Sequence, residues 1–415
     1  MEKKQAPAYR WVILVVVCLI GVLSNYMQYQ ISAMAVSLTP LLKIDPAGFS
    51  TLLMMPMLTA VFLSIPMGTL GDKIGPKRVV FWCLIIAVIG AFLRTFFLNF
   101  PMQAISMFLL GAGIAALNAN LIKILSVWFG DKAQVGMGFF FGSAGIGVIL
   151  AQMVAPRMSV FVSYLTAAII LTIFTVIWLV LIKDVPDGVQ LPPASGESPV
   201  KYFGVAAKSR NVWLIGLCYG FSMAASTAFA GFIPQTLRTI DHFDVTTAGL
   251  VASAAALGSI IGSVIGPQIS SRLRTWKWYL VFTIVVGAAL MCFFWAVVLG
   301  MKAAPAIPVL FIIMMISGTF GAMNGPIVQA MPYALPEIRG KYAGSAGGLV
   351  TAVGLLCAFL IPVIVSKLCG PNLILNLAIE SGIFLISAVF VIAMPELGPG
   401  GKIAQQIAAS EGHKA

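Results

Sequence analysis

Three ionisable side chains lie inside long apolar stretches of this 415-residue sequence, and they are the first candidates for chemistry. They are Arg94, Lys123 and Glu380. Charged groups are rare inside stretches of membrane-spanning length, where they mark substrate or ion pathways. Arg94 and Lys123 have no acid nearby, so they favour an anionic substrate if they face a cavity. Each also lies within about 10 Å of the end of its stretch at the helical rise, which leaves snorkelling to the interface as the alternative.

Glu380 is the only one of the 13 Asp and Glu residues that falls within an apolar stretch. A carboxyl group at that depth suits a proton carrier. Lys367 lies near the end of the preceding stretch and is available as an ion-pair partner. We therefore expect a structural role for Glu380 and keep a proton site as the alternative.

Uncharged polar residues inside the apolar stretches are the candidates for substrate contact. Residues 24–30 form the densest group, and helical spacing brings Asn25 near Gln28 and Tyr29, with Tyr26 also near Tyr29. Some of these side chains must face a cavity or a neighbouring helix. Further candidates are Asn118, Asn120, Tyr219, Ser222, Ser226, Thr227, Asn324 and Gln329. Tyr26, Tyr29 and Tyr219 could instead form a cage for a quaternary ammonium group, which the positive charge balance of the spans disfavours.

The composition shows which elements hold these residues. Hydrophobic residues make up 60% of the chain and charged residues 9%, against about 25% charged in a soluble protein. This composition indicates an all-α integral membrane protein and excludes a cytosolic enzyme and a nucleic-acid-binding protein. A spanning helix needs about 20 apolar residues. Breaks at proline, glycine and charge clusters predict twelve spans, at 11–38, 50–71, 78–98, 101–128, 134–157, 160–183, 211–237, 246–270, 277–300, 306–332, 340–367 and 372–394.

Catalytic, metal and cofactor chemistry has no support in the sequence. His242 and His413 are far apart, in a predicted loop and a predicted tail, and the six cysteines share no ligand spacing. We predict no enzyme activity, no metal site and no cofactor. We expect a small-molecule substrate, a lipid bilayer as surroundings, a coupling proton or counter-substrate, no nucleic acid partner and a monomer.

The basic residues predict the orientation. With twelve spans, 18 of the 25 Lys and Arg residues fall on the side of the N-terminus and five on the other side. Basic loops stay cytoplasmic, so we expect a multi-pass protein of the cell (cytoplasmic) membrane with both termini cytoplasmic. The proline-rich polar stretch 184–210 is the expected cytoplasmic linker between bundles 1–183 and 211–394. Residues 395–415 form a polar cytoplasmic tail.

An internal repeat supports this division into two halves. The letters GSAG occur at 142–145 and again at 344–347, and the same offset relates Trp11 to Trp213 at the starts of the first and seventh spans. Two matched landmarks indicate a duplicated six-helix unit, an arrangement used by secondary transporters. Pro56, Pro66, Pro234, Pro326 and Pro362 are expected to kink their helices.

The predicted loop between the second and third spans, at 68–78, reads GTLGDKIGPKR. It resembles the signature G-x-L-x-D-R/K-x-G-x-K/R-R of the major facilitator superfamily. The resemblance implies two pseudo-symmetric six-helix bundles and a gating role for Asp72, with Lys77 and Arg78 either gating or setting the topology. Further residues that look like the corresponding family loops, and could form ion pairs that break between states, are Asp131, Glu337 and Arg339.

The glycine-rich fifth and eleventh spans are similar to those of nitrate and nitrite porters, and close helix packing is the expected reason for the glycines. Those porters carry an arginine in each of spans two and eight. Here span two has none and span eight has Arg272 only at its end, so nitrate is disfavoured. We predict a secondary transporter that moves a small organic anion by alternating access. The alternatives are an exporter of an amphipathic or quaternary-ammonium compound and a membrane sensor that does not transport.

Overall fold

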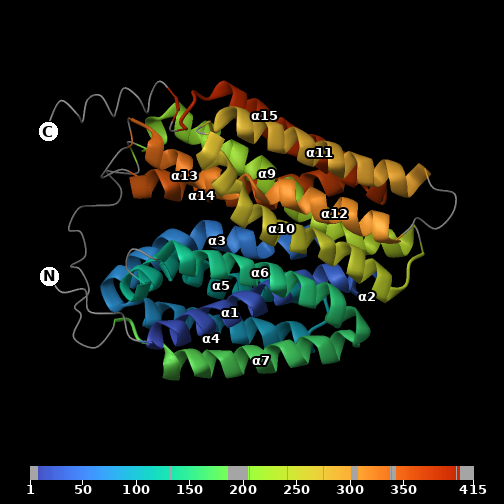
Figure 1. Cartoon of the computed structure of the whole chain (residues 1–415). Coiled ribbons are helices and arrows are strands. Elements are labelled where there is room, and N and C mark those ends of the chain that lie inside the picture. The colour runs from blue at the N-terminus through green and yellow to red at the C-terminus, as the bar shows by residue number, and fades with distance from the viewer. Residues whose placement is uncertain are drawn as a thin grey trace, which may run out of the picture. The chain divides into compact units, whose positions relative to one another are not determined.

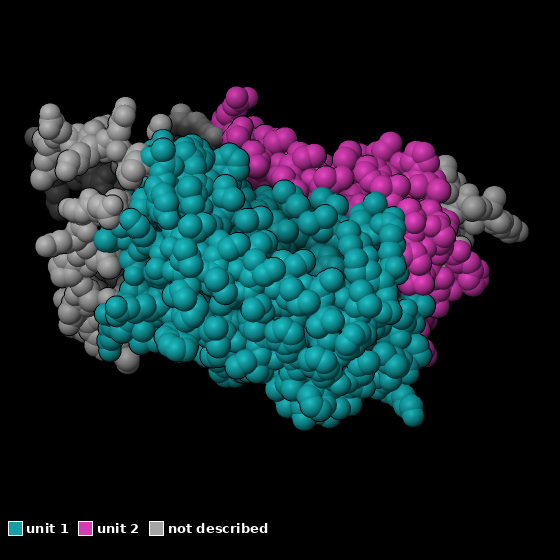
Figure 2. Space-filling model, turned by 90° about the horizontal axis from the view of Figure 1, so that it is seen from below, with its two compact units in different colours: residues 1–196 teal, residues 197–415 magenta. Residues whose placement is uncertain are grey.

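The computed structural model is helical throughout the residues that it describes. These are 8–129, 133–185, 204, 206–240, 242–273, 275–300, 307–336, 338, 343–398 and 400–401. Within them, side chains are not described at 72, 122, 126, 133–135, 271, 296–300, 333 and 343–345. The chain divides into two compact units, unit 1 (Met1–Gly196) and unit 2 (Glu197–Ala415), which Figure 2 colours separately.

Unit 1 is a bundle of long antiparallel helices, coloured blue to green in Figure 1. Its elements are α1 (Tyr9–Ala33), α2 (Ala35–Leu42), α3 (Pro46–Ile74), α4 (Pro76–Phe96), α5 (Phe100–Phe129), α6 (Ala133–Val154), the short 3-10 helix η2 (Ala155–Arg157) and α7 (Val160–Leu181). The main helix pairs are α1 with α6, α3 with α5, and α4 with both α5 and α7.

Unit 2 repeats this pattern of pairing in the second half of the chain (Figure 1). Its elements are α9 (Arg210–Thr239), α10 (Val245–Leu273), α11 (Lys277–Gly300), α12 (Ile307–Ala322), α13 (Gly325–Ala334), α14 (Ala343–Cys369) and α15 (Leu373–Ala393). Here α9 packs on α14, α10 on α12, and α11 on both α12 and α15. The equivalent pairs in the two units show that each half of the chain builds the same bundle.

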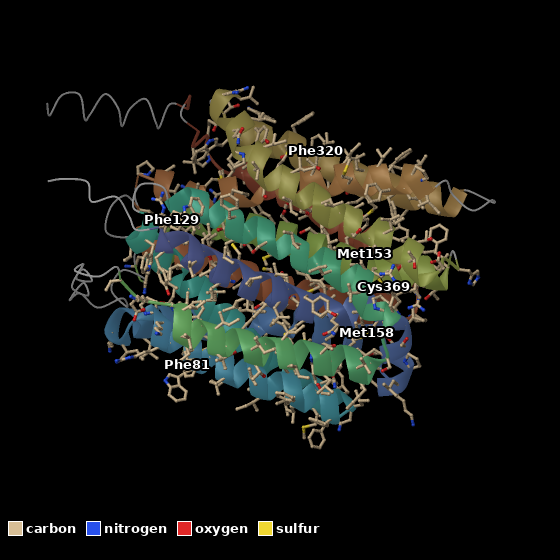
Figure 3. The ribbon with its side chains drawn as sticks, turned by 60° about the horizontal axis from the view of Figure 1, so that its bottom comes forward. Phe81, Phe129, Met153, Met158, Phe320 and Cys369 are labelled. Carbon is tan, nitrogen blue, oxygen red and sulfur yellow. The ribbon has the colours of Figure 1, made fainter. Side chains whose placement is uncertain are left out.

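Twelve helical stretches among the described residues are long and apolar enough to cross a membrane, which confirms the predicted number. The predicted span 50–71 is Pro46–Gly71, and the predicted span 211–237 is Arg210–Thr239. Large apolar side chains cover the outer surfaces of the helices (Figure 3), and Trp82 of α4 and Leu368 of α14 are 62% and 79% exposed. Such exposed apolar groups are favourable in lipid and unfavourable in water.

The tenth span is broken, which differs from the single kinked helix expected there. α12 ends at Ala322 and α13 begins at Gly325, so Pro326 lies in the first turn of a new helix. Proline is tolerated in a first turn because the N–H that it lacks has no partner within the helix there. Pro56, Pro66, Pro234 and Pro362 lie inside the continuous helices α3, α9 and α14.

An acidic residue after the last helix of each unit caps the helix that forms the third span of that unit. In unit 1, the Asp184 carboxylate accepts the backbone N–H of Lys77 at 2.6 Å. In unit 2, the Glu396 carboxylate accepts the backbone N–H of Trp276 at 2.8 Å. A carboxylate stabilises a helix N-terminus through its unpaired N–H groups and its partial positive charge. The two halves therefore share this device as well as their helix pairing.

Candidate functional site

A cavity of about 170 Å³ in unit 2 lies beside the break between α12 and α13. Its lining comes from one face of α9 and from the residues on both sides of the break. The lining residues are Tyr219, Ser222, Met223 and Ser226 of α9, with Gly321, Ala322, Asn324, Gly325 and Val328. None of these nine residues is acidic. The cavity brings together four of the residues predicted from the sequence as substrate contacts: Tyr219, Ser222, Ser226 and Asn324.

Tyr219 is held at the cavity by two helices. Its hydroxyl accepts a hydrogen bond from the Gln329 side-chain amide of α13, with 3.0 Å between Nε2 and the oxygen. Its ring lies against Gly354 of α14, where a Cβ atom would overlap the ring. Because the hydroxyl proton is not used in this bond, Tyr219 retains a donor for a ligand. Gln329, another predicted contact, thus acts on the site through Tyr219.

Asn324 occupies the break itself and is 1% exposed. Its Oδ1 atom accepts a hydrogen bond from the Thr283 hydroxyl of α11. Its Nδ2 atom is buried and has no hydrogen-bond partner among the described residues. The next residue, Gly325, begins α13 and has no heavy atom within 4 Å of the position of a Cβ. The helix N-terminus, which carries a partial positive charge, therefore has open space beside it.

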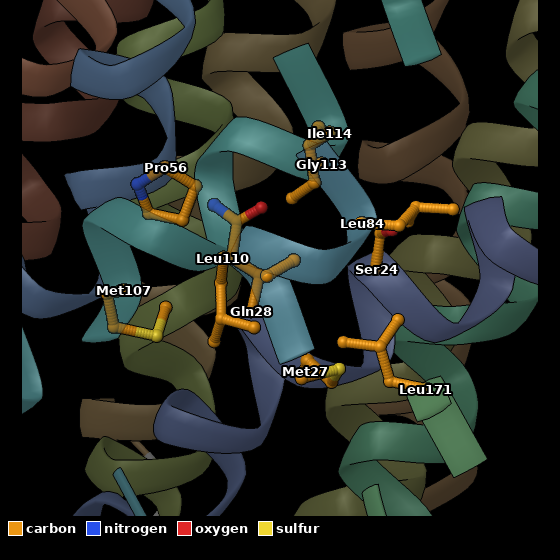
Figure 4. A pocket seen from close by; sticks show the side chains of 11 residues that line it. Ser24, Met27, Gln28, Pro56, Leu84, Met107, Leu110, Gly113, Ile114 and Leu171 are labelled. Carbon is orange, nitrogen blue, oxygen red and sulfur yellow. The ribbon is translucent and has the colours of Figure 1, made fainter. Parts of the chain in front are cut away.

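A second, much smaller cavity lies inside unit 1 (Figure 4) and has room for about one water molecule, at about 10 Å³. Ser24, Met27 and Gln28 of α1 line it together with mostly apolar side chains of α3, α4, α5 and α7. The Gln28 amide donates to the backbone oxygen of Leu53 at 3.1 Å. Gln28 therefore joins α1 to α3.

Arg94 is completely buried in unit 1 and does not snorkel to the surface. Its guanidinium donates to the Met27 carbonyl at 3.0 Å and to Gln30 Oε1 at 2.6 Å. It also stacks on Tyr164 of α7, with 4.3 Å from Cζ to the ring centroid. Gln30 in turn donates to the Ser163 carbonyl of α7 at 2.8 Å. The cation therefore ties α1, α4 and α7 together.

The other polar residues predicted in the first span also lie in unit 1. Asn25 donates to the Gly21 carbonyl of its own helix at 3.0 Å. Tyr26 is half-buried, and its hydroxyl interacts with the side chains of Ser163 and Gln30. Tyr29 is also half-buried, whereas Asn118 is exposed on α5. Tyr26 thus joins the Arg94 group.

Lys123 binds the motif segment that was recognised in the sequence. Its ammonium group donates to the Gly68 carbonyl at 2.5 Å. One turn away, the Asn120 amide donates to the Met67 carbonyl at 3.1 Å, and a Cβ at Gly71 would overlap the Asn120 side chain. Gly71 therefore lets α3 approach α5 closely, and Lys123 fixes that contact.

The charged end of the motif is only partly described. Gly75 has a φ of 90°, in a region that favours glycine, and begins the turn into α4. Lys77 is half-exposed and Arg78 is exposed. The side chain of Asp72 lies outside the described residues, as do Asp131, Glu337 and Arg339 entirely.

Glu380 of α15 is 0% exposed, and neither carboxyl oxygen has a hydrogen-bond partner among the described residues. Lys367, which the sequence offered as an ion-pair partner, is exposed on α14 and does not bond to the carboxylate. The preceding residue, Ser366, faces α15 instead and accepts a hydrogen bond from Asn376 at 2.8 Å. Successive residues on a helix point in different directions, so Ser366 and Lys367 cannot both face α15.

Tyr219, Ser222, Ser226, Asn324 and Gln329 were predictable because polar residues stand out in apolar spans. Thr283 and Gly325, which complete the site around Asn324, were not among the predicted residues. Asp184, the acid that caps α4 beside the motif, was not predicted either. The sequence letters N-G-P at 324–326 are a helix-break signal that could have located the break.

Two units of matching helix pairs, twelve membrane-length stretches among the described residues, and a cavity with four polar lining residues beside a broken helix are the features of a multi-pass membrane protein of the transporter class. The chain belongs to the Major Facilitator Superfamily, whose sequence profile matches residues 18–362. This membership confirms that the protein is a secondary transporter and not an enzyme.

Relatives of the chain include transporters named for anions. A probable nitrate transporter NarT from Staphylococcus epidermidis is 24% identical over 331 residues, which cover 78% of this chain and 80% of that protein. A probable sulfoacetate transporter SauU from Cupriavidus necator is 23% identical, with coverage of 68% and 69%. Among solved structures, an inward-facing, unoccupied bacterial homologue of the human lysosomal transporter Spinster matches with a TM-score of 0.66. It has 13% identity and covers 93% of this chain and 95% of that chain.

Proposed function

We propose that the protein moves a small organic anion across the membrane by alternating access, and that the cavity of unit 2 is part of its substrate site. The observation that carries this proposal is the chemistry of the cavity lining. Tyr219 and Asn324 supply hydrogen-bond donors, the N-terminus of α13 supplies a partial positive charge, and no lining residue is acidic. Helix N-termini beside broken spans recognise anionic groups in other transporters.

The anionic group would lie at the break, beside Gly325, where a Cβ meets nothing within 4 Å, and next to Asn324, whose buried Nδ2 has no partner among the described residues. The Tyr219 hydroxyl would donate from the opposite helix. Hydrogen bonds from neutral donors to an anion are stronger than those between neutral groups. A carboxylate or sulfonate offers several acceptor oxygens to these donors, and the rest of a small substrate would contact Met223 and Val328.

The names of the relatives support an anion but leave two classes, inorganic nitrate and organic acids. The arginines expected for a nitrate porter are missing from the middle of the second and eighth spans. α3 contains no arginine, and Arg272 lies in the last turn of α10. This pattern favours an organic anion over nitrate. The experiment must therefore compare the uptake of both.

The test is uptake by purified protein in proteoliposomes. Labelled sulfoacetate, a small sugar acid, nitrate and choline are compared under the same gradients. We expect uptake of an organic anion, and expect Tyr219→Phe to lower the affinity about tenfold, the effect of one lost hydrogen bond to a charged group. Tyr279→Phe is the matched control, because this α11 tyrosine lies outside the cavity and its hydroxyl has no partner among the described residues.

Each outcome of this assay decides something. Uptake of choline and of no anion refutes the proposal in favour of a cationic substrate. Binding of labelled anion without accumulation in any gradient indicates a sensor. If Tyr219→Phe and Tyr279→Phe lowered the affinity for the anion equally, the cavity would not be part of the substrate site. The proposal of anion transport itself would still stand.

We also propose the orientation and the remaining roles expected from the sequence. Both termini are placed in the cytoplasm, with 184–210 as a cytoplasmic linker, and the transporter works as a monomer. Tags at the two ends that react with an impermeant reagent only after cell lysis would support this topology. Gating is proposed for Asp72, Lys77 and Arg78, and for Asp131 with Glu337 and Arg339. Charge reversal at these positions tests the gating roles, because it should change the proportion of molecules in the inward-facing and outward-facing states.

A further inference from the structure

Glu380 in unit 2 belongs to a buried group of acceptor atoms that have no donor among the described residues. Both oxygens of Glu380 are buried and have no hydrogen-bond partner among the described residues. Asn376 lies one turn earlier on the same face of α15, and its Oδ1 atom is likewise buried and unpartnered. The amide nitrogen of Asn376 is already used by Ser366 of α14. Three acceptor oxygens on one buried face therefore lack a donor.

The helices packed against α15 are α9, α11 and α14. Their ionisable residues with described side chains are Arg210, Cys218, Tyr219 and Arg238 on α9, Lys277, Tyr279 and Cys292 on α11, and Cys357, Lys367 and Cys369 on α14. Among these described residues, the Cys369 thiol is the one that is close enough to feel the charge of Glu380. Lys367 is exposed, and Lys277 donates to the Ile392 and Met394 carbonyls at the far end of α15.

An ionised carboxylate in such a place is strongly unfavourable, because it has lost its water without gaining a partner. Adding one proton makes the group neutral and turns one acceptor oxygen into a donor. That donor is the kind of group that Asn376 Oδ1 lacks. Among the described residues, no basic side chain bonds to the carboxylate, so a proton is the simplest ligand that suits it.

We propose that Glu380 is a proton-binding site that loads and unloads during the transport cycle and so couples transport to the proton gradient. The coupling rests on the proposed anion transport, whereas proton binding itself does not. In the loaded state, the proton is bonded to one oxygen of Glu380. Release leaves a carboxylate, which needs water or a donor, so unloading requires the packing of α15 on its neighbours to open. One proton moved with one monovalent anion carries no net charge.

Infrared difference spectroscopy of the purified protein tests proton binding without any knowledge of the substrate. A protonated carboxyl group gives a carbonyl band separate from the carboxylate bands. We expect this band in the wild type, expect it to disappear reversibly when the pH is raised from about 5 to about 10, and expect Glu380→Gln to lack it. Asp45→Asn is the matched control, because Asp45 is an exposed helix cap that asparagine replaces well. Circular dichroism checks that both variants are folded.

A band that stays unchanged until the protein unfolds would overturn the proposal and make Glu380 a permanently protonated structural group. A wild type without the band would also overturn it. In a wild type without the band, the ligand would be a sodium ion if sodium chloride raised its stability and choline chloride did not. Glu380→Gln would then show no such stabilisation by sodium chloride.

Transport then tests the coupling. In proteoliposomes, we expect an imposed pH gradient to drive accumulation of a transported anion by the wild type and by Asp45→Asn. Glu380→Gln is expected to lose this accumulation while it still exchanges the same labelled anion across the membrane. Equal accumulation by Glu380→Gln and the wild type would refute coupling at this residue. If no anion is transported by any variant, the proposed function fails, and the spectroscopic result still decides proton binding.

Discussion

Gly75→Ala is predicted to destabilise unit 1 by about 2 to 4 kcal/mol, from two effects at the motif turn. An alanine at a φ of 90° is strained, which costs about 1 to 3 kcal/mol. The new Cβ would also lie 2.6 Å from an Asp184 carboxylate oxygen, so Asp184 must move away from the Lys77 N–H that it caps. Loss of a hydrogen bond to a charged group costs about 1.5 to 3 kcal/mol, less here because the carboxylate is half-exposed.

Reversible unfolding of the purified protein in detergent measures this loss. Gly138→Ala is the control, since no heavy atom lies within 4 Å of a Cβ at this position of α6, and its free energy of unfolding should change by less than about 1 kcal/mol. Because the clash and the lost cap both involve Asp184, the double variant with Asp184→Ala should lose less than the sum of the single variants, while the backbone strain at residue 75 remains. A free energy of unfolding for Gly75→Ala within about 0.5 kcal/mol of the wild type would refute this reading of the motif.

Two further predictions concern the site and the loop before α10. Gly354→Ala should push Tyr219 away from the cavity and lower the affinity for the transported anion in binding assays, whereas Gly348→Ala on the same helix, where a Cβ meets nothing within 4 Å, should leave it unchanged. Equal affinities in the two variants would show that Gly354 does not position the tyrosine. Asp244 caps α10, and hydrogen bonds from the Thr247 side chain and from the backbone lower its pKa from the ordinary value. The ionised Asp244 therefore contributes to stability at every pH above the ordinary pKa of aspartate. This contribution is lost as the pH falls through the lowered pKa. Asp244→Asn should remove this acid-dependent part of the melting profile, and an unchanged profile would contradict it.

The twelve spans and the two-unit plan were predictable because they depend on local composition. Lipid requires long apolar helices, and the repeat at 142–145 and 344–347 shows directly in the letters. The polar residues of α9 and α13 were also predictable as site candidates, since polar groups inside such helices need a reason. Local signals therefore located Tyr219 and Asn324 without showing that they meet.

Contacts between distant residues decided what the sequence left open. Whether Arg94 snorkels or turns inward depends on Gln30 and Tyr164, which lie on other helices. Lys367 was available in the sequence as a partner for Glu380, but the neighbouring Ser366 is the residue of α14 that bonds to α15. Such orientations follow from packing and are not encoded in hydropathy or spacing.

The most direct test of the site is a cryo-electron microscopy map of the protein with and without a saturating transported anion. We predict added density beside the first turn of α13, within hydrogen-bonding reach of Asn324, the Gly325 N–H and the Tyr219 hydroxyl. Density for the anion elsewhere, with the cavity of unit 2 unchanged between the two maps, would contradict the account.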